Sequence, residues 1–214
     1  MRGYARSTAF GGIPFFIPSL DIHALIHALA TEGAVSVPLL TEPARQALLL
    51  EAQHFHYEPE IKTVGTGDAV VRTEYSACTR LPDNGLYPEF KQAFQTLLDQ
   101  ACDRLDAYPF STPLQFTELV VQRYEPGQLG ITPHRDSLRA INLIALVNLG
   151  GQAEFYCCDD RQGTHAVQLD TTPGNVIFLR APGFLNTSVR PFHFVTHIRS
   201  TRYSLGLRQR IGNG

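Results

Sequence analysis

The chain has 214 residues, of which 43% are apolar, and its formal net charge is −2. This size suits one domain with a proper core, no apolar stretch approaches the roughly 18 residues that a membrane span needs, and a slightly negative chain is a poor non-specific binder of nucleic acid. The four cysteines have no C-x-x-C spacing, so ordinary thiols in a reducing cytoplasm are expected, not a disulfide framework or a zinc site.

The N-terminal half combines helical patterns with loops. Gly and Pro break up the first twenty residues, which predicts an irregular arm that Phe15 and Phe16 anchor to the core. Helices are expected over 21–33, 41–55 and 89–105. Asp21 and Thr41 are suitable N-caps for the first two helices. Residues 57–88, between the second and third helices, show strand and turn patterns.

A strand and a turn lead to the residues with the clearest chemical meaning. An aliphatic run ending at Tyr124 predicts the strand, and Pro126-Gly127 predicts the turn. Side chains two apart on an extended backbone share a face, so His134 and Asp136 point the same way. With a second histidine they would form a 2-His-1-carboxylate triad, which leaves open positions on Fe(II). Taken alone, such a triplet is more often part of a surface loop.

Short strands and turns follow the His134-x-Asp136 triplet. Strands are expected over 140–149, 153–158, 164–169 and 175–180. Gly150-Gly151 predicts a hairpin, and Pro173-Gly174 fits the centre of a type II turn. Strands and turns at this spacing indicate a β-sandwich or a jelly roll.

The last strand pattern places two arginines on one face. Alternation from Arg202 to Arg208 puts both guanidiniums with Ser204 on one side, and Tyr203, Leu205 and Leu207 on the other. Guanidiniums that point inward need anionic partners. A dicarboxylate is a natural partner, because an arginine fork matches a carboxylate in bidentate geometry.

In order and spacing, these motifs resemble those of the Fe(II)/2-oxoglutarate-dependent dioxygenases, and most closely the AlkB family of oxidative nucleic-acid demethylases. The matching pieces are the run Gln-Arg-Tyr-Glu-Pro-Gly from 122, His134-x-Asp136, His193-x-Val195 and Arg202–Arg208, so the likeness spans about 118–208. The resemblance implies an α+β fold in one domain over 1–214. A double-stranded β-helix (jelly-roll) core over 111–210 would be flanked by N-terminal helices and a substrate lid within 1–110. It also implies Fe(II), the cosubstrate 2-oxoglutarate and O2.

The third metal ligand has three candidates. His165 lies in a strand pattern without a supporting motif, and His193 and His197 would share a face of an extended segment, so the residues alone leave both open. The resemblance selects His193, because its His-x-Val pattern precedes the cosubstrate arginine by nine residues. The implied metal ligands are therefore His134, Asp136 and His193.

The resemblance also assigns a cosubstrate site. Arg202 with Ser204 would bind the distal carboxylate of 2-oxoglutarate, Arg208 would stabilise the carboxylate near the metal, and Tyr124 would add a hydroxyl donor. Gln122 and Ser204 stand where AlkB-type enzymes have asparagines, and both remain polar. A buried dianion needs charge-assisted partners of this kind.

On the substrate side the chain departs from the AlkB pattern. Leu138 and Arg139 stand where those demethylases place acidic residues, and no tryptophan is available to stack a flipped base, although Tyr75 could replace it. Arg72, Tyr75 and Arg80 in the expected lid are candidate substrate contacts. The alternative is that the tyrosine packs inward and both arginines are solvated.

Three functions follow from these residues. Arg139 suits a carboxylate or phosphate better than a cationic alkylated base, so hydroxylation or demethylation of a small, anionic molecule or of a protein side chain is favoured. The alternative is an AlkB-like oxidative demethylase of alkylated nucleic-acid bases. A jelly-roll binding protein without catalysis is the third, against which the complete set of motifs argues. Nothing in the sequence indicates a membrane partner or an oligomeric state.

Overall fold

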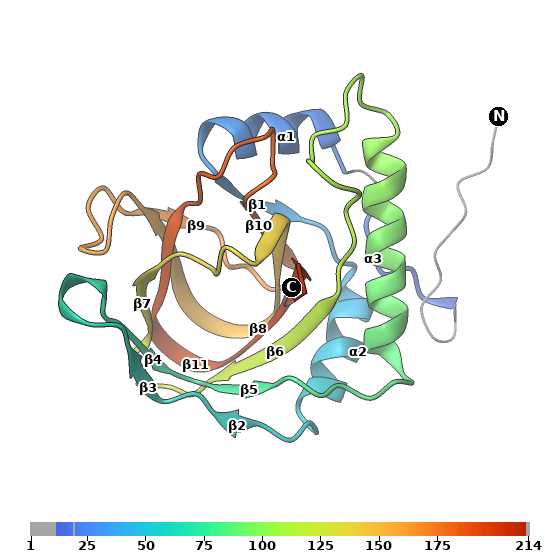
Figure 1. Ribbon diagram of the computed structural model, residues 1–214. Helices are drawn as coiled ribbons and strands as arrows, with labels where there is room; N and C mark the ends of the chain where they lie inside the picture. The colour runs from blue at the N-terminus through green and yellow to red at the C-terminus, as the bar shows by residue number, and fades with distance from the viewer. Residues whose placement is uncertain (1–11, 19, 213–214) are drawn as a thin grey trace.

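The computed structural model describes residues 12–18 and 20–212, and Figure 1 shows helices around a curved antiparallel sheet. The helices are α1 (Ile22–Thr31), α2 (Glu42–Ala52) and α3 (Leu86–Cys102), with a short 3-10 turn at Gly67–Ala69. No helix in this described part combines the length and the apolarity needed to cross a bilayer. The strands are β1 (Ala34–Pro38), β2 (Glu58–Pro59), β3 (Lys62–Val64), β4 (Val71–Glu74), β5 (Ser76–Cys78), β6 (Glu118–Tyr124), β7 (Gly130–His134), β8 (Ala140–Cys158), β9 (Val167–Leu169), β10 (Asn175–Arg180) and β11 (Phe192–Arg210).

The sheet follows the order β1-β10-β8-β11-β6-β5-β2, and its pairs are antiparallel. β7 pairs with β11 and with β4, β4 pairs with β3, and β9 pairs with β8. β8 and β11 have 19 residues each and pair along most of their length, so they form the curved centre of the sheet. The predicted α+β class, with a jelly-roll core flanked by N-terminal helices, is confirmed.

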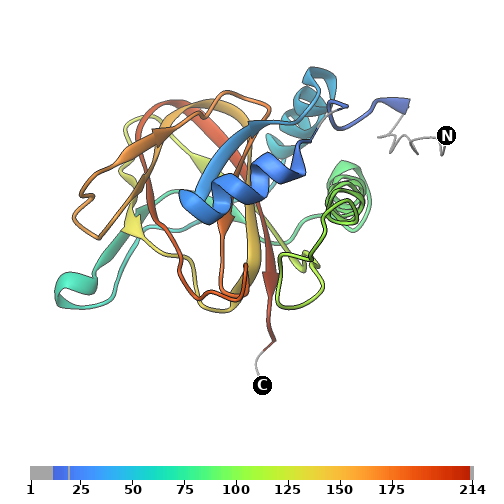
Figure 2. The same ribbon diagram turned by 90° about the horizontal axis from the view of Figure 1, so that it is seen from above.

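The two faces of the sheet belong to two different cores. On β8, Ala145 and Val147 join the core under the helices, whereas Ile144 and Leu146 join the core inside the curve. This split follows from the period-two alternation of a strand. From above, α2 (light blue) and α3 (green) lie on one side of the sheet, and the β3–β4 connection (teal) projects at the opposite end (Figure 2). The helices thus seal one face, and the other face is left to line a cavity.

Local capping signals set the starts of α1 and α2. The side chains of Asp21 and Thr41 accept backbone N–H groups of their first turns, as predicted. The third helix starts three residues before its predicted start, at Leu86, although Gly85 offers no side-chain cap. The carboxylate of Glu51 accepts the Leu86 N–H at 3.2 Å instead. A residue of α2 therefore caps α3, which local sequence cannot reveal.

Part of the predicted N-terminal arm, residues 1–11 and 19, lies outside the described residues. Its two predicted anchors are described. Phe15 is 1% exposed and its ring centroid lies 5.4 Å from that of Phe90, while Phe16 packs at 5.9 Å from Phe94. Both contacts are with α3, so the arm docks through the aromatic residues that the sequence indicated.

β8 runs without interruption through the two glycines at which the sequence predicts a hairpin, and this prediction is wrong. Gly151 has φ +85°, and a Cβ there would overlap the backbone of Thr201 and Arg202 on β11. The register between β8 and β11 shifts in the same region, which marks a bulge. A Cβ at Gly150 would meet Leu49 of α2 at 2.9 Å. The glycine pair therefore allows close approach on both sides of one long strand and forms no turn.

Candidate active site

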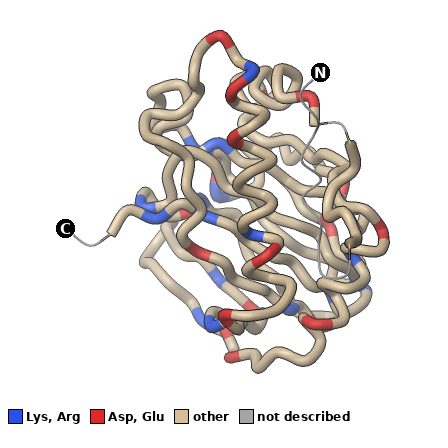
Figure 3. Tube along the Cα trace, turned by 90° about the vertical axis from the view of Figure 1, so that its right-hand side faces the viewer, with Lys and Arg blue, Asp and Glu red and all other residues tan. Residues whose placement is uncertain are grey.

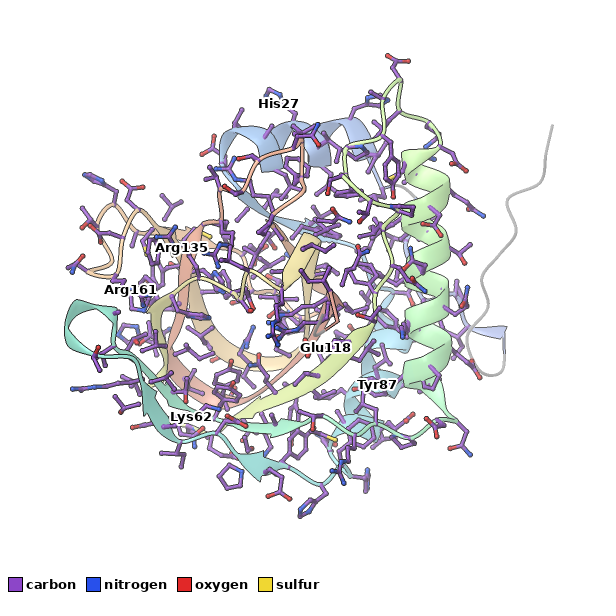
Figure 4. The ribbon with its side chains drawn as sticks, viewed as in Figure 1. His27, Lys62, Tyr87, Glu118, Arg135 and Arg161 are labelled. Atoms are coloured by element: carbon purple, nitrogen blue, oxygen red, sulfur yellow. The ribbon has the colours of Figure 1, made fainter. Side chains whose placement is uncertain are left out.

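A cavity of about 330 Å³ opens on the inner face of the sheet. Side chains of β6, β7, β8 and β11 line it together with those of the lid strands β4 and β5, and Figure 4 shows them converging on the interior of the curve. Nine of the twelve site residues expected from the sequence line this cavity: Tyr75, Gln122, Tyr124, His134, Asp136, His193, Arg202, Ser204 and Arg208.

Strand register brings these distant residues together. β7 pairs with β11 so that His134 lies opposite His193. β11 pairs with β6 so that Ser204 lies opposite Gln122. Residues directly opposite each other in an antiparallel pair project to the same face, so the register gathers the expected metal ligands and the expected cosubstrate residues on one surface.

His134, Asp136 and His193 meet at one end of the cavity. The ring centroids of the two histidines are 4.4 Å apart, and Nε2 of His193 lies 3.4 Å from Oδ2 of Asp136. That oxygen is buried and has no hydrogen-bond partner. Among the described residues, no three His, Cys, Asp or Glu side chains are already disposed as a metal cluster. The orphaned oxygen beside an imidazole nitrogen is nevertheless a donor atom that a cation would satisfy.

Backbone carbonyls orient both imidazoles. Nδ1 of His134 lies 3.0 Å from the carbonyl oxygen of Thr132, and Nδ1 of His193 lies 3.4 Å from that of Pro191. A carbonyl can only accept, so these contacts place the proton on Nδ1 and leave the lone pair on Nε2. Burial, together with the charge of His193, lowers the pKa of His134 to about 4. The imidazole is therefore neutral near pH 7, which is the form that binds metals.

Arg208 fixes the charge of Asp136. Its Nε donates to Oδ1 of Asp136 at 2.9 Å, and its Nη1 lies 4.0 Å from Glu118. Burial is the largest single influence on Asp136 and opposes its ionisation, but the charge of Arg208 and the contacts with the two histidines together outweigh burial and hold the pKa of the carboxyl well below its usual range. One oxygen is thus bonded to arginine and the other lies 3.4 Å from Nε2 of His193. Two imidazole nitrogens and one carboxylate oxygen are a donor set that fits a divalent metal such as Fe(II).

Arg202 lies in the same cavity with a different environment. Its side chain is 2% exposed, its Nη2 donates to Oδ1 of Asn148 at 2.7 Å, and its guanidinium lies 5.3 Å from the ring centroid of Tyr124. Among the described residues, no carboxylate lies within ion-pair distance of it. Burial lowers the pKa of this guanidinium. A buried cation without an anion is costly, so this end of the cavity favours an anionic ligand.

Asn148 was missed by the sequence reasoning, although it left a signal. It is 2% exposed and interrupts the apolar run of β8, where a polar residue needs a buried partner. Tyr124, which is 1% exposed, donates its hydroxyl to Oε1 of Gln122 at 3.2 Å. A polar wall therefore surrounds the Arg202 guanidinium, made of an amide on one side and a phenol with its amide partner on the other.

The four expected substrate residues separate into two groups. The ring of Tyr75 lies inside the cavity, 5.2 Å from that of Tyr124, and its hydroxyl reaches the side chain of Gln122. Arg72, Arg80 and Arg139 are exposed and do not line the cavity. Strand alternation explains why Arg72 points away from the cavity, because its neighbours on β4 face inward.

The other two histidines lie away from the cavity. His197 is exposed, with φ +50°, and its Nδ1 is 2.9 Å from Glu154. The expectation that His193 and His197 share a face is wrong, because the register of β11 against β8 shifts just after residue 196 and the alternation breaks there. His165 is exposed and its Nδ1 lies 2.8 Å from Asp159.

No protein-family model and no curated protein sequence matches this chain. Solved structures do. A prolyl hydroxylase in complex with a hypoxia inducible factor oxygen degradation domain peptide fragment, from Trichoplax adhaerens, has TM-score 0.61 and 15% identity over 88% of each chain. An oxidoreductase of the 2OG-Fe(II) oxygenase family from Burkholderia pseudomallei has TM-score 0.58 and 17% identity, covering 92% of this chain and 94% of that one. OsALKBH1 has TM-score 0.56 and 18% identity, covering 83% and 98%.

The chain has the fold of the 2OG-Fe(II) oxygenases. The likeness extends over most of each chain. At this level of architecture it confirms the resemblance expected from the motifs. The proteins that share this oxygenase fold include a hydroxylase and an AlkB homologue by name, so the fold is compatible with either substrate class.

Proposed function

We propose that this protein is an Fe(II)- and 2-oxoglutarate-dependent dioxygenase that hydroxylates or demethylates a small, anionic substrate. One observation carries the proposal. The cavity holds a buried guanidinium, Arg202, which has no anion among the described residues, and an ionised carboxylate, Asp136, whose orphaned oxygen lies 3.4 Å from Nε2 of His193. A dicarboxylate that also binds a cation would satisfy both groups.

The residues divide the work of binding. His134 and His193 through Nε2, and Asp136 through Oδ2, would hold the metal. Arg202 and Ser204 would hold the distal carboxylate of 2-oxoglutarate, with Asn148 orienting the guanidinium. When bound, Fe(II) supplies the oxidising chemistry, in which 2-oxoglutarate and O2 yield succinate and CO2 and one oxygen atom enters a substrate C–H bond.

The surrounding side chains keep the site oriented and dry. Arg208 helps to keep Asp136 ionised and, by bonding to Oδ1, holds the carboxylate with Oδ2 beside Nε2 of His193. The ring of Phe155 stacks on His193 at 5.6 Å, nearly parallel at 12°, and is 1% exposed. Together with the buried ring of Tyr124, the Phe155 ring excludes water from the space between the expected metal ligands and Arg202.

Two features favour a small substrate over a nucleic acid. Tyr75, the aromatic residue expected to stack a flipped base, packs on Tyr124 and bonds to Gln122 inside the cavity. The side that carries α3, away from the cavity, mixes acidic and basic residues (Figure 3) and does not provide the continuous basic track that a nucleic-acid surface needs. Oxidation of a peptide residue is the second candidate, since a neighbour in structure is a prolyl hydroxylase in complex with a peptide.

A matched pair of histidines on β11 tests the proposal. The wild-type protein with Fe(II) and 2-oxoglutarate under argon should show a weak metal-to-ligand charge-transfer band, and in air it should release succinate slowly without substrate. His193→Ala should lose both signals, because a ligand is gone, and His197→Ala should keep both. Succinate from His193→Ala at the wild-type rate would refute the metal assignment.

Absence of the charge-transfer band in the wild-type protein, together with undetectable succinate, would leave only the non-catalytic binding protein. The two readouts are complementary because the band reports the chelated cosubstrate and succinate reports its turnover.

A further inference from the structure

Two arginines lie over one phenylalanine ring where β7 ends and β11 begins, and a third arginine is close enough to the first to repel it. The guanidinium carbons of Arg135 and Arg161 lie 4.0 and 5.6 Å from the ring centroid of Phe192. Arg190 donates Nη1 to the backbone carbonyl of Asp136. Figure 4 labels Arg135 and Arg161 near each other, from the segments after β7 and β8. We call Arg135, Arg161 and Arg190 the arginine cluster.

The cluster lacks ion-pair partners. None of its three members has a carboxylate within ion-pair distance among the described residues. Nη1 of Arg161 and Nε of Arg190 are buried without an acceptor. Arg190 is attracted by Asp136, but the only carboxylate oxygen of Asp136 that accepts a hydrogen bond accepts it from Arg208. Two buried donors and three like charges therefore lie close together, and no side chain of the described residues forms an ion pair with them.

The acidic residues closest along the chain are already engaged. Asp160 accepts hydrogen bonds from the backbone of Gln162 and from the hydroxyl and N–H of Thr164, which closes its own turn. Asp159 pairs with His165 at 2.8 Å. Neither carboxylate forms a hydrogen bond or ion pair with a cluster arginine within the described part of the chain, so the turn that carries Arg161 does not compensate its charge.

Stacking on Phe192 explains where Arg135 and Arg161 lie but leaves the buried donors without acceptors. A cation over an aromatic face gains from the ring, yet the gain does not supply an oxygen to an N–H group. An oxyanion would accept hydrogen bonds from both orphaned donors, and its negative charge would offset the mutual repulsion of the guanidiniums. Guanidinium forks are the side chains that match such groups in bidentate geometry.

We propose that the arginine cluster binds a phosphate group of the substrate. This inference rests on the proposed function only in naming the ligand as the substrate. A phosphate offers three terminal oxygens and close to two charges, which suits three guanidiniums better than a carboxylate does. The three arginines form one compact group, which fits the single phosphate of a small molecule. A phosphodiester chain would require a row of such contacts.

The position of the cluster gives such a phosphate a role. Arg135 stands in the chain between two expected metal ligands, His134 and Asp136. Arg190 donates to the backbone carbonyl of Asp136. A phosphate held there would lie at the rim beside the metal end of the cavity and away from Arg202. The remainder of the substrate can then enter the cavity with a fixed orientation.

Inorganic phosphate is the probe for the test, titrated into the full chain and followed by 31P NMR line broadening or calorimetry. The wild-type protein should bind it with a dissociation constant of about a millimolar, as expected for a few charge-assisted hydrogen bonds. The variant carrying Arg135→Gln and Arg161→Gln should bind at least about tenfold more weakly. The single variant Arg135→Gln, at an exposed position, should show a smaller loss of phosphate affinity. It keeps the test valid if the double variant fails to fold.

Two control variants separate this proposal from the proposed function. Arg199→Gln removes an exposed arginine on β11 that pairs with Glu154, and Arg202→Met removes the cavity cation. Arg199→Gln should bind phosphate like the wild type, and Arg202→Met should keep the phosphate binding that the double variant loses. If Arg202→Met loses phosphate and the double variant keeps it, phosphate binds in the cavity and the cluster proposal is wrong, while the cosubstrate site stands.

Acetate and a short single-stranded oligonucleotide complete the test. Acetate should bind the wild type at least about tenfold more weakly than phosphate does. Acetate as tight as phosphate would overturn the choice of phosphate over carboxylate. An oligonucleotide that binds far more tightly than phosphate, with a steep salt dependence lost in the double variant, would overturn the small-molecule substrate and support nucleic acid.

Discussion

Replacing Arg202 by methionine should weaken 2-oxoglutarate binding and leave the ligand-free protein as stable as before, or more stable. The substitution leaves a flexible, unbranched side chain, shorter than arginine, and removes a buried charge that has Asn148 and the Tyr124 ring as partners but no anion among the described residues. Loss of two charge-assisted hydrogen bonds to a carboxylate corresponds to about 3 to 4 kcal/mol, or roughly 150- to 900-fold in dissociation constant.

The ligand-free protein experiences a different balance. A buried ion costs several kcal/mol in lost hydration, and the hydrogen bond to Asn148 returns about 1 to 3 kcal/mol of that cost. Removing the buried charge together with its hydrogen bond should change the free energy of unfolding by about 0 to +2 kcal/mol. This is equivalent to a melting temperature that is unchanged or up to roughly 8 °C higher. The variant should therefore bind worse and be no less stable.

Arg208→Met is the matched control, because it lies on the same face of the same strand with its Nε 2.9 Å from Asp136. Breaking a buried pair leaves a carboxylate unpaired and costs about 3 to 5 kcal/mol. Differential scanning fluorimetry with and without Mn(II) and 2-oxoglutarate measures both variants, and calorimetry gives the affinity. A loss of stability in Arg202→Met as large as that in Arg208→Met would refute the reasoning that Arg202 is a buried charge without an anionic partner in the ligand-free protein.

Three further substitutions test the fold around the site. Gly151→Ala should cost at least about 3 kcal/mol in urea unfolding, since a Cβ there overlaps β11 at positive φ, whereas Gly127→Ala, with φ +83° and open space, should cost about 1 kcal/mol. Asn142→Ala should cost about 3 kcal/mol, because this fully buried residue at φ 64° donates its side-chain amide at 2.8 to 3.1 Å to three acceptors. Glu42, whose pKa hydrogen bonds from Arg45 lower to about 2, stabilises the fold above its unfolded pKa near 4.5 and loses this contribution as the pH falls toward 2. The stability advantage over Glu42→Gln should therefore shrink across that window in acid unfolding curves.

The helices were predictable from sequence to the extent that their signals are local. Asp21 and Thr41 cap their own first turns, so both starts could be predicted within a residue. The start of α3 depends on Glu51, a residue of another helix, and was predicted three residues late. The glycine pair in β8 carries the composition of a turn but meets β11 and α2 on either side. Composition alone cannot distinguish a turn from a close approach of backbones.

The candidate site was predictable where strand alternation is unbroken. From Arg202 to Arg208 the strict period of two places both arginines and Ser204 in the cavity, as the pattern indicated. The same rule fails between His193 and His197, because the register shift between β11 and β8 is a property of the pair of strands and not of either sequence. The separation of cavity and surface histidines therefore required the structure.

Arg202 and Arg208 show why a shared face does not imply a shared role. Both guanidiniums belong to one strand and one cavity, and sequence alternation treats them alike. The pairing of β7 with β11 brings Asp136 to Arg208 and no carboxylate to Arg202. One arginine is therefore neutralised within the folded chain and fixes an expected metal ligand, while the other remains a buried charge until a ligand supplies the anion. A buried charge of this kind favours an anionic ligand, which is why the proposal places the distal carboxylate of the cosubstrate at Arg202.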